Sequence, residues 1–175
     1  MNLLTIYSIG HGAQPLAQFL ETLREGGIGT LADVRTAPRS RKHPHFDGAA
    51  LAASLRDAGI DYVHLKGLGG WRRADPSSPH AALRSPGFRG YADHLSSAEF
   101  ARYYAILQEH ARSRPTAYMC AETMWWRCHR RILSDRLFAD DWSVLHLLRP
   151  GESEPHRLAK EARIVGGRLL YDVLA

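Results

Sequence analysis

Two cysteines stand beside residue types that turn a thiol into a nucleophile. Cys120 and Glu122 fall in the segment MCAE, and Cys128 is flanked by three arginines in the segment WRCHRR. Neighbouring cations and a helix N-terminus both favour the thiolate, so Cys128 is expected to be the more reactive thiol. The pattern indicates a nucleophilic Cys128 or Cys120, with His11 or His129 as the base and Glu122 as an acid or orienting group.

Two other interpretations of the cysteines remain open. Together with a histidine they have the chemistry of metal ligands, but the spacing C-x7-C-H is not a standard zinc spacing. No metal ligand is therefore assigned, and the sequence identifies no cofactor. Cysteine is also among the most buried residue types, so either thiol can serve only to pack the core.

Basic residues form a second set that could do chemistry. The formal net charge is +5, and every basic residue except Lys42, Lys66 and Lys160 is an arginine. Arginine grips phosphate or carboxylate through two parallel N–H groups, which indicates an anionic partner. A GC-rich genome also favours arginine, but it does not explain why the arginines cluster. The residues assigned to substrate binding are Arg35, Arg39, Arg41, Arg89, Tyr91, Arg127 and Arg130.

His11 is the remaining candidate for catalysis, and it lies in the turn Gly10-His11-Gly12. Glycine tolerates positive φ and lets backbone N–H groups approach an anion closely. An imidazole with an ordinary pKa near neutrality can act as a general acid or base. The alternative is a histidine that only caps the turn through its ring nitrogens.

The elements predicted around these residues alternate between strand and helix. β-rich runs over 3–9, 30–34, 60–65, 116–120 and 143–148 are separated by helical spacing over 15–25, 47–58, 91–112 and 128–138. The region 91–112 is either one long helix or two helices that abut at Ser96-Ser97. This alternation predicts one α/β domain over 1–175, a three-layer sandwich with a mainly parallel central sheet flanked by helices. A Gly-Gly turn predicts a C-terminal β-hairpin over 162–173.

The candidate residues follow the predicted strands, and ligands of parallel sheets bind beyond the carboxyl ends of the strands. We therefore expect His11, Arg35, Cys120 and Arg130 to converge in one pocket. Residues 66–87 contain several Gly and Pro and predict a long loop that could act as a lid.

Composition excludes several classes of protein. Of the 175 residues, 45% are hydrophobic and 23% are charged, which is typical of a globular chain and not of a disordered or collagen-like one. No apolar run approaches the roughly 20 residues of a membrane span, and residues 1–9 lack the features of a signal peptide. With two cysteines and no export signal, the protein is expected to be cytoplasmic, its cysteines to be thiols, and a membrane is not among its expected partners.

These motifs together resemble the DUF488 family, small and mostly bacterial proteins named for their unknown function. The matching motifs are SIGHG, DVR, YVHL, LGG, FRGYAD and MCAE through WRCHR, in the family's order over about residues 5–148. The family often has Ser or Asn after the first His, where this chain has Gly12, which leaves only backbone there. The resemblance implies an α/β fold but no reaction.

The sequence thus predicts an enzyme that acts on a phosphate-bearing substrate, a nucleotide or nucleic acid, at a Cys/His/Arg site on the strand C-terminal rim. The expected classes are a thiol-dependent hydrolase or transferase, or thiol redox chemistry. The alternative is a non-catalytic nucleic-acid or nucleotide-binding module that uses the same arginines. Glu122 favours the enzyme, because a carboxylate beside the arginines adds nothing to polyanion binding.

Overall fold

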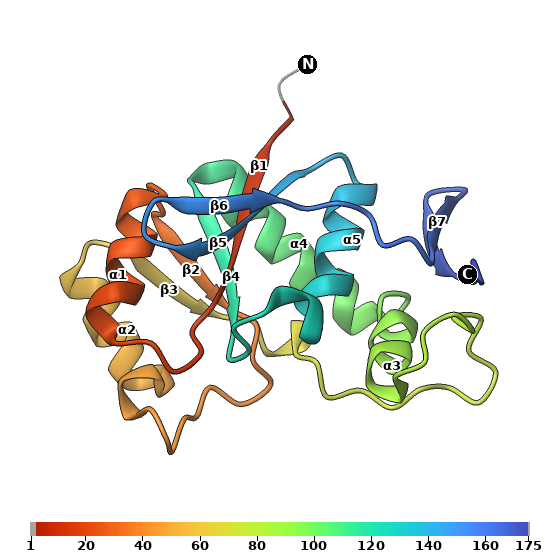
Figure 1. The fold of residues 1–175 in the computed structure, drawn as a ribbon, viewed down its shortest axis with the longest axis horizontal. Coiled ribbons are helices and arrows are strands. Elements are labelled where there is room, and N and C mark those ends of the chain that lie inside the picture. Colours follow the sequence, from red (N-terminus) through yellow and green to blue (C-terminus); the bar gives the residue numbers. More distant parts are fainter. Residues whose placement is uncertain (1–2, 175) are drawn as a thin grey trace.

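A computed structural model describes residues 3–174 as a twisted sheet covered by helices on both faces (Figure 1). The strands are β1 Thr5–Gly10, β2 Thr30–Asp33, β3 Asp61–His64, β4 Thr116–Cys120, β5 Ser143–Arg149, β6 Glu152–Pro155, β7 Ala162–Val165 and β8 Arg168–Tyr171. The α-helices are α1 Leu16–Glu25, α2 Gly48–Asp57, α3 Pro86–His94, α4 Ala98–Ser113 and α5 Arg130–Ala139. Short 3-10 turns cover Pro44–Phe46, Lys66–Leu68 and Trp125–Arg127.

The main sheet has the order β3-β2-β4-β1-β5-β6, and its first five strands are parallel. The edge strand β6 runs antiparallel to β5. Because β4 lies between β2 and β1, the carboxyl ends of these three strands meet at the middle of one edge. This confirms the predicted α/β class and the mainly parallel sheet.

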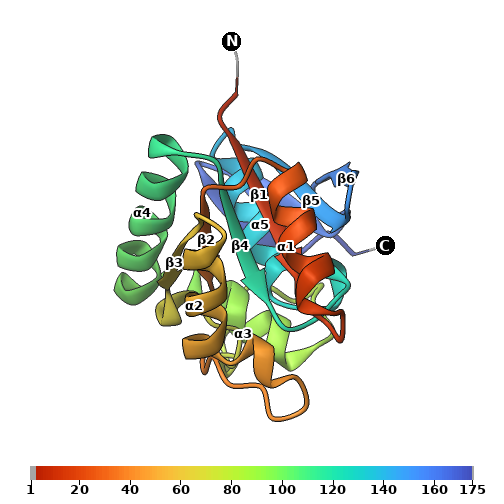
Figure 2. The same ribbon diagram turned by 90° about the vertical axis from the view of Figure 1, so that its left-hand side faces the viewer.

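Two apolar cores lie on opposite faces of the sheet, and strand alternation assigns residues to each. Ala117 and Met119 of β4 pack with α1 and α2, while Tyr118 and Cys120 pack with α4 and α5. Figure 2 shows α4 on one side of the sheet and α1 on the other. Cys120 therefore faces the side on which α5 begins.

The helical region predicted over 91–112 is two helices that meet at Ser96-Ser97, the second of the two arrangements predicted, because Ser97 Oγ accepts a hydrogen bond from Phe100 N and caps α4. The first of them, α3, begins earlier than predicted, at Pro86. The predicted helix over 128–138 begins two residues later, at Arg130, because the 3-10 turn before it leaves Cys128 extended. Cys128 thus precedes the helix by two residues and is outside its first turn.

The C-terminal hairpin is confirmed as β7 and β8, which pair antiparallel around Gly166 and Gly167. Both glycines have positive φ, 55° and 74°, as a type I′ turn requires. Across the described residues, no helix is long and apolar enough to cross a membrane.

Candidate active site at the carboxyl ends of β1, β2 and β4

The site is built where β1 and β4 end side by side. Gly10 is paired with Cys120, and beyond it His11 N donates to Cys120 O at 3.0 Å. A Cβ on Gly10 would lie 1.9 Å from Glu122 O and 2.6 Å from a terminal guanidinium nitrogen of Arg130. Only glycine at this position lets the loop after β4 and the Arg130 side chain close over β1.

The two cysteines lie in contact at this point. Their sulfurs are 3.0 Å apart, and both are free thiols. Arg130 Nε lies 3.1 Å from Cys120 Sγ and 3.3 Å from Cys128 Sγ. Arg130 is only 1% exposed, so a buried guanidinium faces both sulfurs at once.

The thiol pair shares one proton. The hydrogen bond from Cys120 and the charge of Arg130 lower the pKa of Cys128 to about 6, against burial, which acts to raise it. The same hydrogen bond and burial raise the pKa of Cys120 well above its usual range. At neutral pH the pair is therefore a Cys128 thiolate that accepts a hydrogen bond from a Cys120 thiol. The sequence predicts Cys128 as the more reactive thiol because of the arginines, and in the structure the hydrogen bond from Cys120 is the larger cause of its lowered pKa.

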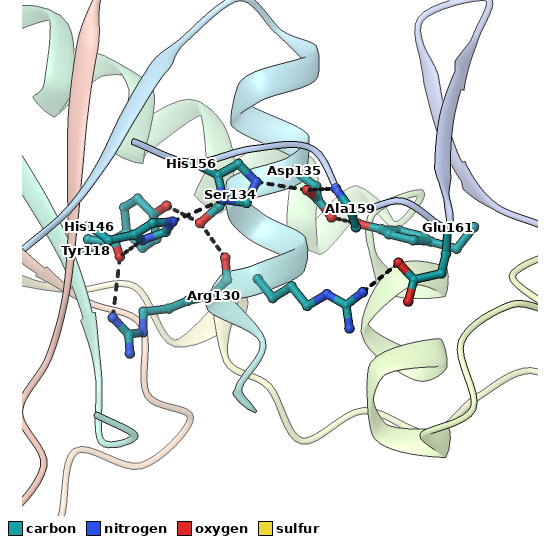
Figure 3. A network of polar contacts seen from close by, with 11 residues as sticks. Tyr118, Arg130, Ser134, Asp135, His146, His156, Ala159 and Glu161 are labelled. Atoms are coloured by element: carbon teal, nitrogen blue, oxygen red, sulfur yellow. Dashed lines mark hydrogen bonds and ion pairs between the residues drawn. The ribbon is translucent and has the colours of Figure 1, made fainter. Parts of the chain in front are cut away.

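A chain of buried hydrogen bonds supports Arg130 from behind (Figure 3). An Arg130 terminal nitrogen lies 3.4 Å from Ser8 Oγ, and Ser8 Oγ lies 2.6 Å from His146 Nδ1. His146 Nε2 is 3.0 Å from His156 Nδ1, and His156 Nε2 is 2.8 Å from Asp135 Oδ1. We call these four residues, Ser8, His146, His156 and Asp135, the relay.

The Asp135 carboxylate sets the direction of every bond in the relay. A carboxylate only accepts, so His156 Nε2 carries a hydrogen and His156 Nδ1 accepts from His146. His146 Nδ1 then accepts the Ser8 hydroxyl hydrogen, which leaves the Ser8 oxygen to accept from Arg130. The relay therefore presents an acceptor to the Arg130 guanidinium.

The relay also joins the C-terminal hairpin to the site. Tyr171 of β8 donates through its hydroxyl to Asp135 Oδ2 at 2.7 Å.

The ring of Trp125 stacks on His146 with centroids 4.1 Å apart and planes 3° apart. Burial, then the neighbouring His156 and Arg130, lowers the pKa of His146 to about 3, so its ring is neutral at pH 7.

A second buried arginine lies at the end of β2. Arg35 forms a two-pronged ion pair with Asp33, with Nε to Oδ1 at 2.9 Å and a terminal nitrogen to Oδ2 at 2.6 Å. Its other terminal nitrogen donates to Phe46 O and to His11 Nε2, at 2.8 and 3.3 Å. Tyr62 also donates to Asp33 Oδ2. Arg35 is thus fixed in place before any ligand arrives.

His11 lies behind this arginine with both ring nitrogens engaged. Its Nδ1 donates to Gly12 O at 2.8 Å, its Nε2 accepts from Arg35, and its ring stacks on Phe46. Burial lowers the pKa of His11 to about 4. This geometry makes His11 a neutral residue that positions Arg35.

These residues open into a cavity of about 400 Å³. It is lined by Arg35, Thr36, Ala37, Arg39, Gly70, Trp71, Ser85, Gly87, Phe88, Cys120, Ala121, Glu122, Arg127, Cys128 and His129. We call it the thiolate pocket. Residues 70–71 and 85–88 form one wall, so the ends of the long predicted loop and the start of α3 border the site.

Six of the predicted site residues line the thiolate pocket, and the others lie elsewhere. The six are Cys120, Glu122, Cys128, Arg35, Arg39 and Arg127. His11 and Arg130 lie directly behind them. Arg89 donates to Leu83 O, and the buried Tyr91 donates to Leu68 O, so both hold backbone. Arg41 is exposed and is not among the lining residues.

His129, which the sequence indicates only as an alternative to His11 for the base, lines the pocket. Its Nε2 donates to Val34 O at 3.2 Å, which leaves Nδ1 as the unprotonated nitrogen. Burial, then the charge of Arg130, lowers the pKa of His129 to about 4. A Cβ on Gly70 would lie 2.4 Å from this Nδ1, so Gly70 makes room for the ring. His129 thus lines the pocket as a neutral ring whose Nδ1 is unprotonated and lies against Gly70.

Across residues 3–174, no three His, Cys, Asp or Glu side chains are grouped as metal ligands would be.

Comparison with known proteins gives one match. A family model described as a domain of unknown function, DUF488, matches residues 15–137, a stretch that includes Arg35, both cysteines and Arg130. Neither a curated protein nor a solved structure matches the chain.

Proposed function

This chain belongs to the DUF488 family, whose function is unknown, and we propose from its site that it is a thiol-dependent enzyme acting on a phosphate-bearing substrate. The observation that carries this proposal is the position of the Cys128 sulfur, which lines the same pocket as Arg39 and Arg127 while Arg130 contacts it from behind. A thiolate supplies the nucleophile, and arginines at the mouth supply the anion site.

The arginines at the site form two groups, which differ in burial and in the role we assign to them. Arg35 and Arg130 are buried and already hydrogen-bonded, so they set the charge of the pocket and the ionisation of its thiol. Arg39 and Arg127 are exposed at the pocket, and within residues 3–174 their side chains make no hydrogen bond. They are the groups free to grip phosphate.

Aromatic side chains extend the site beyond a simple phosphate. Trp71 is 82% exposed although it lines the pocket, and Phe88 lines it as well. An exposed indole beside arginines suits stacking on a base, at roughly 1–3 kcal/mol per stacked base. A nucleotide, free or in a strand, is the substrate that fits these contacts.

The reaction that fits is hydrolysis or group transfer through a covalent intermediate on Cys128. The thiolate attacks an electrophilic atom of the substrate, so that a bond to Cys128 forms while the bond to the leaving group breaks. Water in hydrolysis, or an acceptor in group transfer, then takes the group from Cys128 and restores the thiolate, while the arginines hold the phosphate. Glu122 and His129 border the pocket and are the groups placed to exchange protons with substrate or water. A binding module without catalysis has no use for a thiolate held in this way.

The test of the anion site measures binding of adenosine monophosphate and of a labelled single-stranded oligonucleotide across a salt series. Arg39→Ala and Arg127→Ala are each expected to weaken binding about tenfold, the loss of one charge-assisted contact. For the oligonucleotide, each should also reduce the salt slope by about 0.7. Arg24→Ala is the matched control, because Arg24 is exposed near the far end of α1.

Catalysis is tested by measuring how fast Cys128 is alkylated with and without bound nucleotide, and by the activity of a Cys128→Ser variant. A bound nucleotide is expected to protect Cys128 from iodoacetamide, and Cys128→Ser is expected to keep binding but lose turnover. Binding without turnover would favour the nucleic-acid or nucleotide module. No protection by any phosphate compound, with salt-independent binding, would rule out the proposal.

A further inference from the structure

We infer that Cys120 and Cys128 form a dithiol–disulfide couple, so that the site also reduces disulfides whose thiol halves carry negative charge. This activity uses the thiolate pocket of the proposed function but needs no phosphate. It rests on the placement of two sulfurs, and the group transfer proposed above requires only one of them.

The distance between the sulfurs is the first observation. They lie 3.0 Å apart, and a disulfide bond measures about 2.05 Å. Closing the bond therefore requires a shift of about 1 Å, which side-chain rotation at Cys128 can supply because the residue is extended and precedes α5.

The two sulfurs also differ in accessibility. Cys120 ends β4 and is only 3% exposed, while Cys128 is half-buried. A disulfide that enters the pocket is therefore expected to meet Cys128 first. Cys120 Sγ lies 3.0 Å from the Cys128 sulfur that would carry the mixed disulfide, which is the position of a resolving thiol.

The first half-reaction is an exchange at Cys128. Its thiolate attacks one sulfur of a substrate RS–SR′, the Cys128–SR bond forms, the RS–SR′ bond breaks, and R′S⁻ leaves with the electron pair. The negative charge that Cys128 carried is then gone. Arg130 Nε, 3.1 Å from Cys120, now faces Cys120 without a competing thiolate.

The second half-reaction follows from that change in charge. The neighbouring thiolate no longer opposes ionisation of Cys120, so Cys120 gives up its one proton, to R′S⁻ or, where R′S⁻ is too weak a base, to water, and attacks Cys128 Sγ. The Cys120–Cys128 bond forms, the Cys128–SR bond breaks and RS⁻ leaves. The chain has lost two electrons and one proton, and the substrate has taken up the two electrons as the thiolates RS⁻ and R′S⁻. A dithiol reductant must return the pair to its starting state.

Charge at the pocket defines the class of substrate. Arg39 and Arg127 line it, and among its lining residues Glu122 is the one acidic side chain. A cavity of about 400 Å³ accepts one half of a small disulfide. Disulfides of thiols that carry carboxylate groups fit these features better than neutral ones.

The test uses 5,5′-dithiobis(2-nitrobenzoate), an anionic aromatic disulfide, with reduced protein and without oxygen. The wild-type chain is expected to release two thionitrobenzoate ions and to lose two hydrogen masses, with no adduct. Cys120→Ser is expected to release one ion and to keep one as an adduct on Cys128. Cys128→Ser should react slowly, through the buried Cys120.

Charge selectivity is measured by comparing this reagent with the neutral bis(2-hydroxyethyl) disulfide. For each disulfide, the rate of its reaction with the protein is divided by the rate of its reaction with free N-acetylcysteine. The wild-type chain should prefer the anionic reagent, and Arg39→Ala should reduce that preference about tenfold. Adducts retained on the wild-type chain, or the same products from Cys120→Ser and wild type, would overturn the inference. Neither outcome depends on nucleotide binding, so the proposed function is tested separately.

Discussion

Replacing Arg130 with methionine is expected to lower the free energy of unfolding by about 3–5 kcal/mol. The guanidinium is buried among both sulfurs, Ser8 Oγ and two backbone carbonyls of the loop after β4. Methionine fills similar space but donates no hydrogen bond, so these acceptors are left unpaired in the interior. The loss is measured by urea unfolding at pH 7.5.

The same substitution is expected to remove the thiolate. Without Arg130, only the hydrogen bond from Cys120 is left to oppose burial, so the pKa of Cys128 should rise from about 6 toward that of a free thiol. A rise to about 8 lowers the thiolate fraction at pH 7 about tenfold. The thiolate is measured by its absorbance near 240 nm.

Two comparison variants separate the causes. Arg131→Met removes the neighbouring guanidinium, which makes a partly exposed ion pair with Glu161 worth about 0–1 kcal/mol, and should leave the thiolate intact. Arg130→Lys keeps a charge but cannot serve both sulfurs and the carbonyls, so its thiolate fraction should be intermediate. If Arg130→Met matched Arg131→Met in both stability and thiolate absorbance, the assigned role of Arg130 would be wrong.

Acid is expected to unfold the protein in a narrow range of pH. His11 and His146 are buried, and their pKa values in the fold are lowered to about 4 and about 3 from an ordinary 6.5. At pH values between each lowered pKa and 6.5, the histidine binds a proton in the unfolded chain but not in the folded one. The stabilisation is therefore complete above about pH 6.5 and is lost as the pH falls, by about 3 kcal/mol for each histidine at pH 4. Losing about 6 kcal/mol would remove much of the 5–15 kcal/mol of a typical domain.

Unfolding in urea at a series of pH values between 7.5 and 4 measures this loss. His11→Phe keeps a ring to stack on Phe46, and His146→Phe keeps a ring to stack on Trp125. Neither variant can bind the proton, so each should be less stable than wild type at pH 7.5 but lose less stability on acidification. Variants as steeply dependent on pH as the wild-type chain would contradict the assignment of neutral, buried rings.

Much of the fold could be predicted from the sequence, because the residues that begin and end its strands, helices and turns form local patterns. Strand–helix alternation and the Gly-Gly turn predicted the parallel sheet and the hairpin, and the strand ends predicted that Arg35 and Cys120 border one site. Strand β6 was not predicted, because its Glu-Ser-Glu-Pro sequence is polar and pairs only at a sheet edge. Local patterns do not mark such a strand.

The supporting residues could not be read from the sequence, because distant contacts create them. Ser8 and His146 meet across neighbouring strands, and Asp135 joins them only through His156. Distant residues also complete the ion pair of Arg35 with Asp33: Tyr62 of β3 donates to Asp33, and His11, in the turn after β1, accepts from Arg35. Arg35 and Arg130 were predicted to hold substrate, but these contacts fix both side chains within the fold.

The most direct measurement is the rate at which iodoacetamide alkylates each cysteine between pH 5 and 9, with the modified peptide identified by mass. We expect Cys128 to be alkylated first, at a rate that inflects near pH 6, while Cys120 stays protected. Faster alkylation of Cys120, or an inflection for Cys128 at about 8.5, would contradict the thiolate on which the proposed enzyme depends.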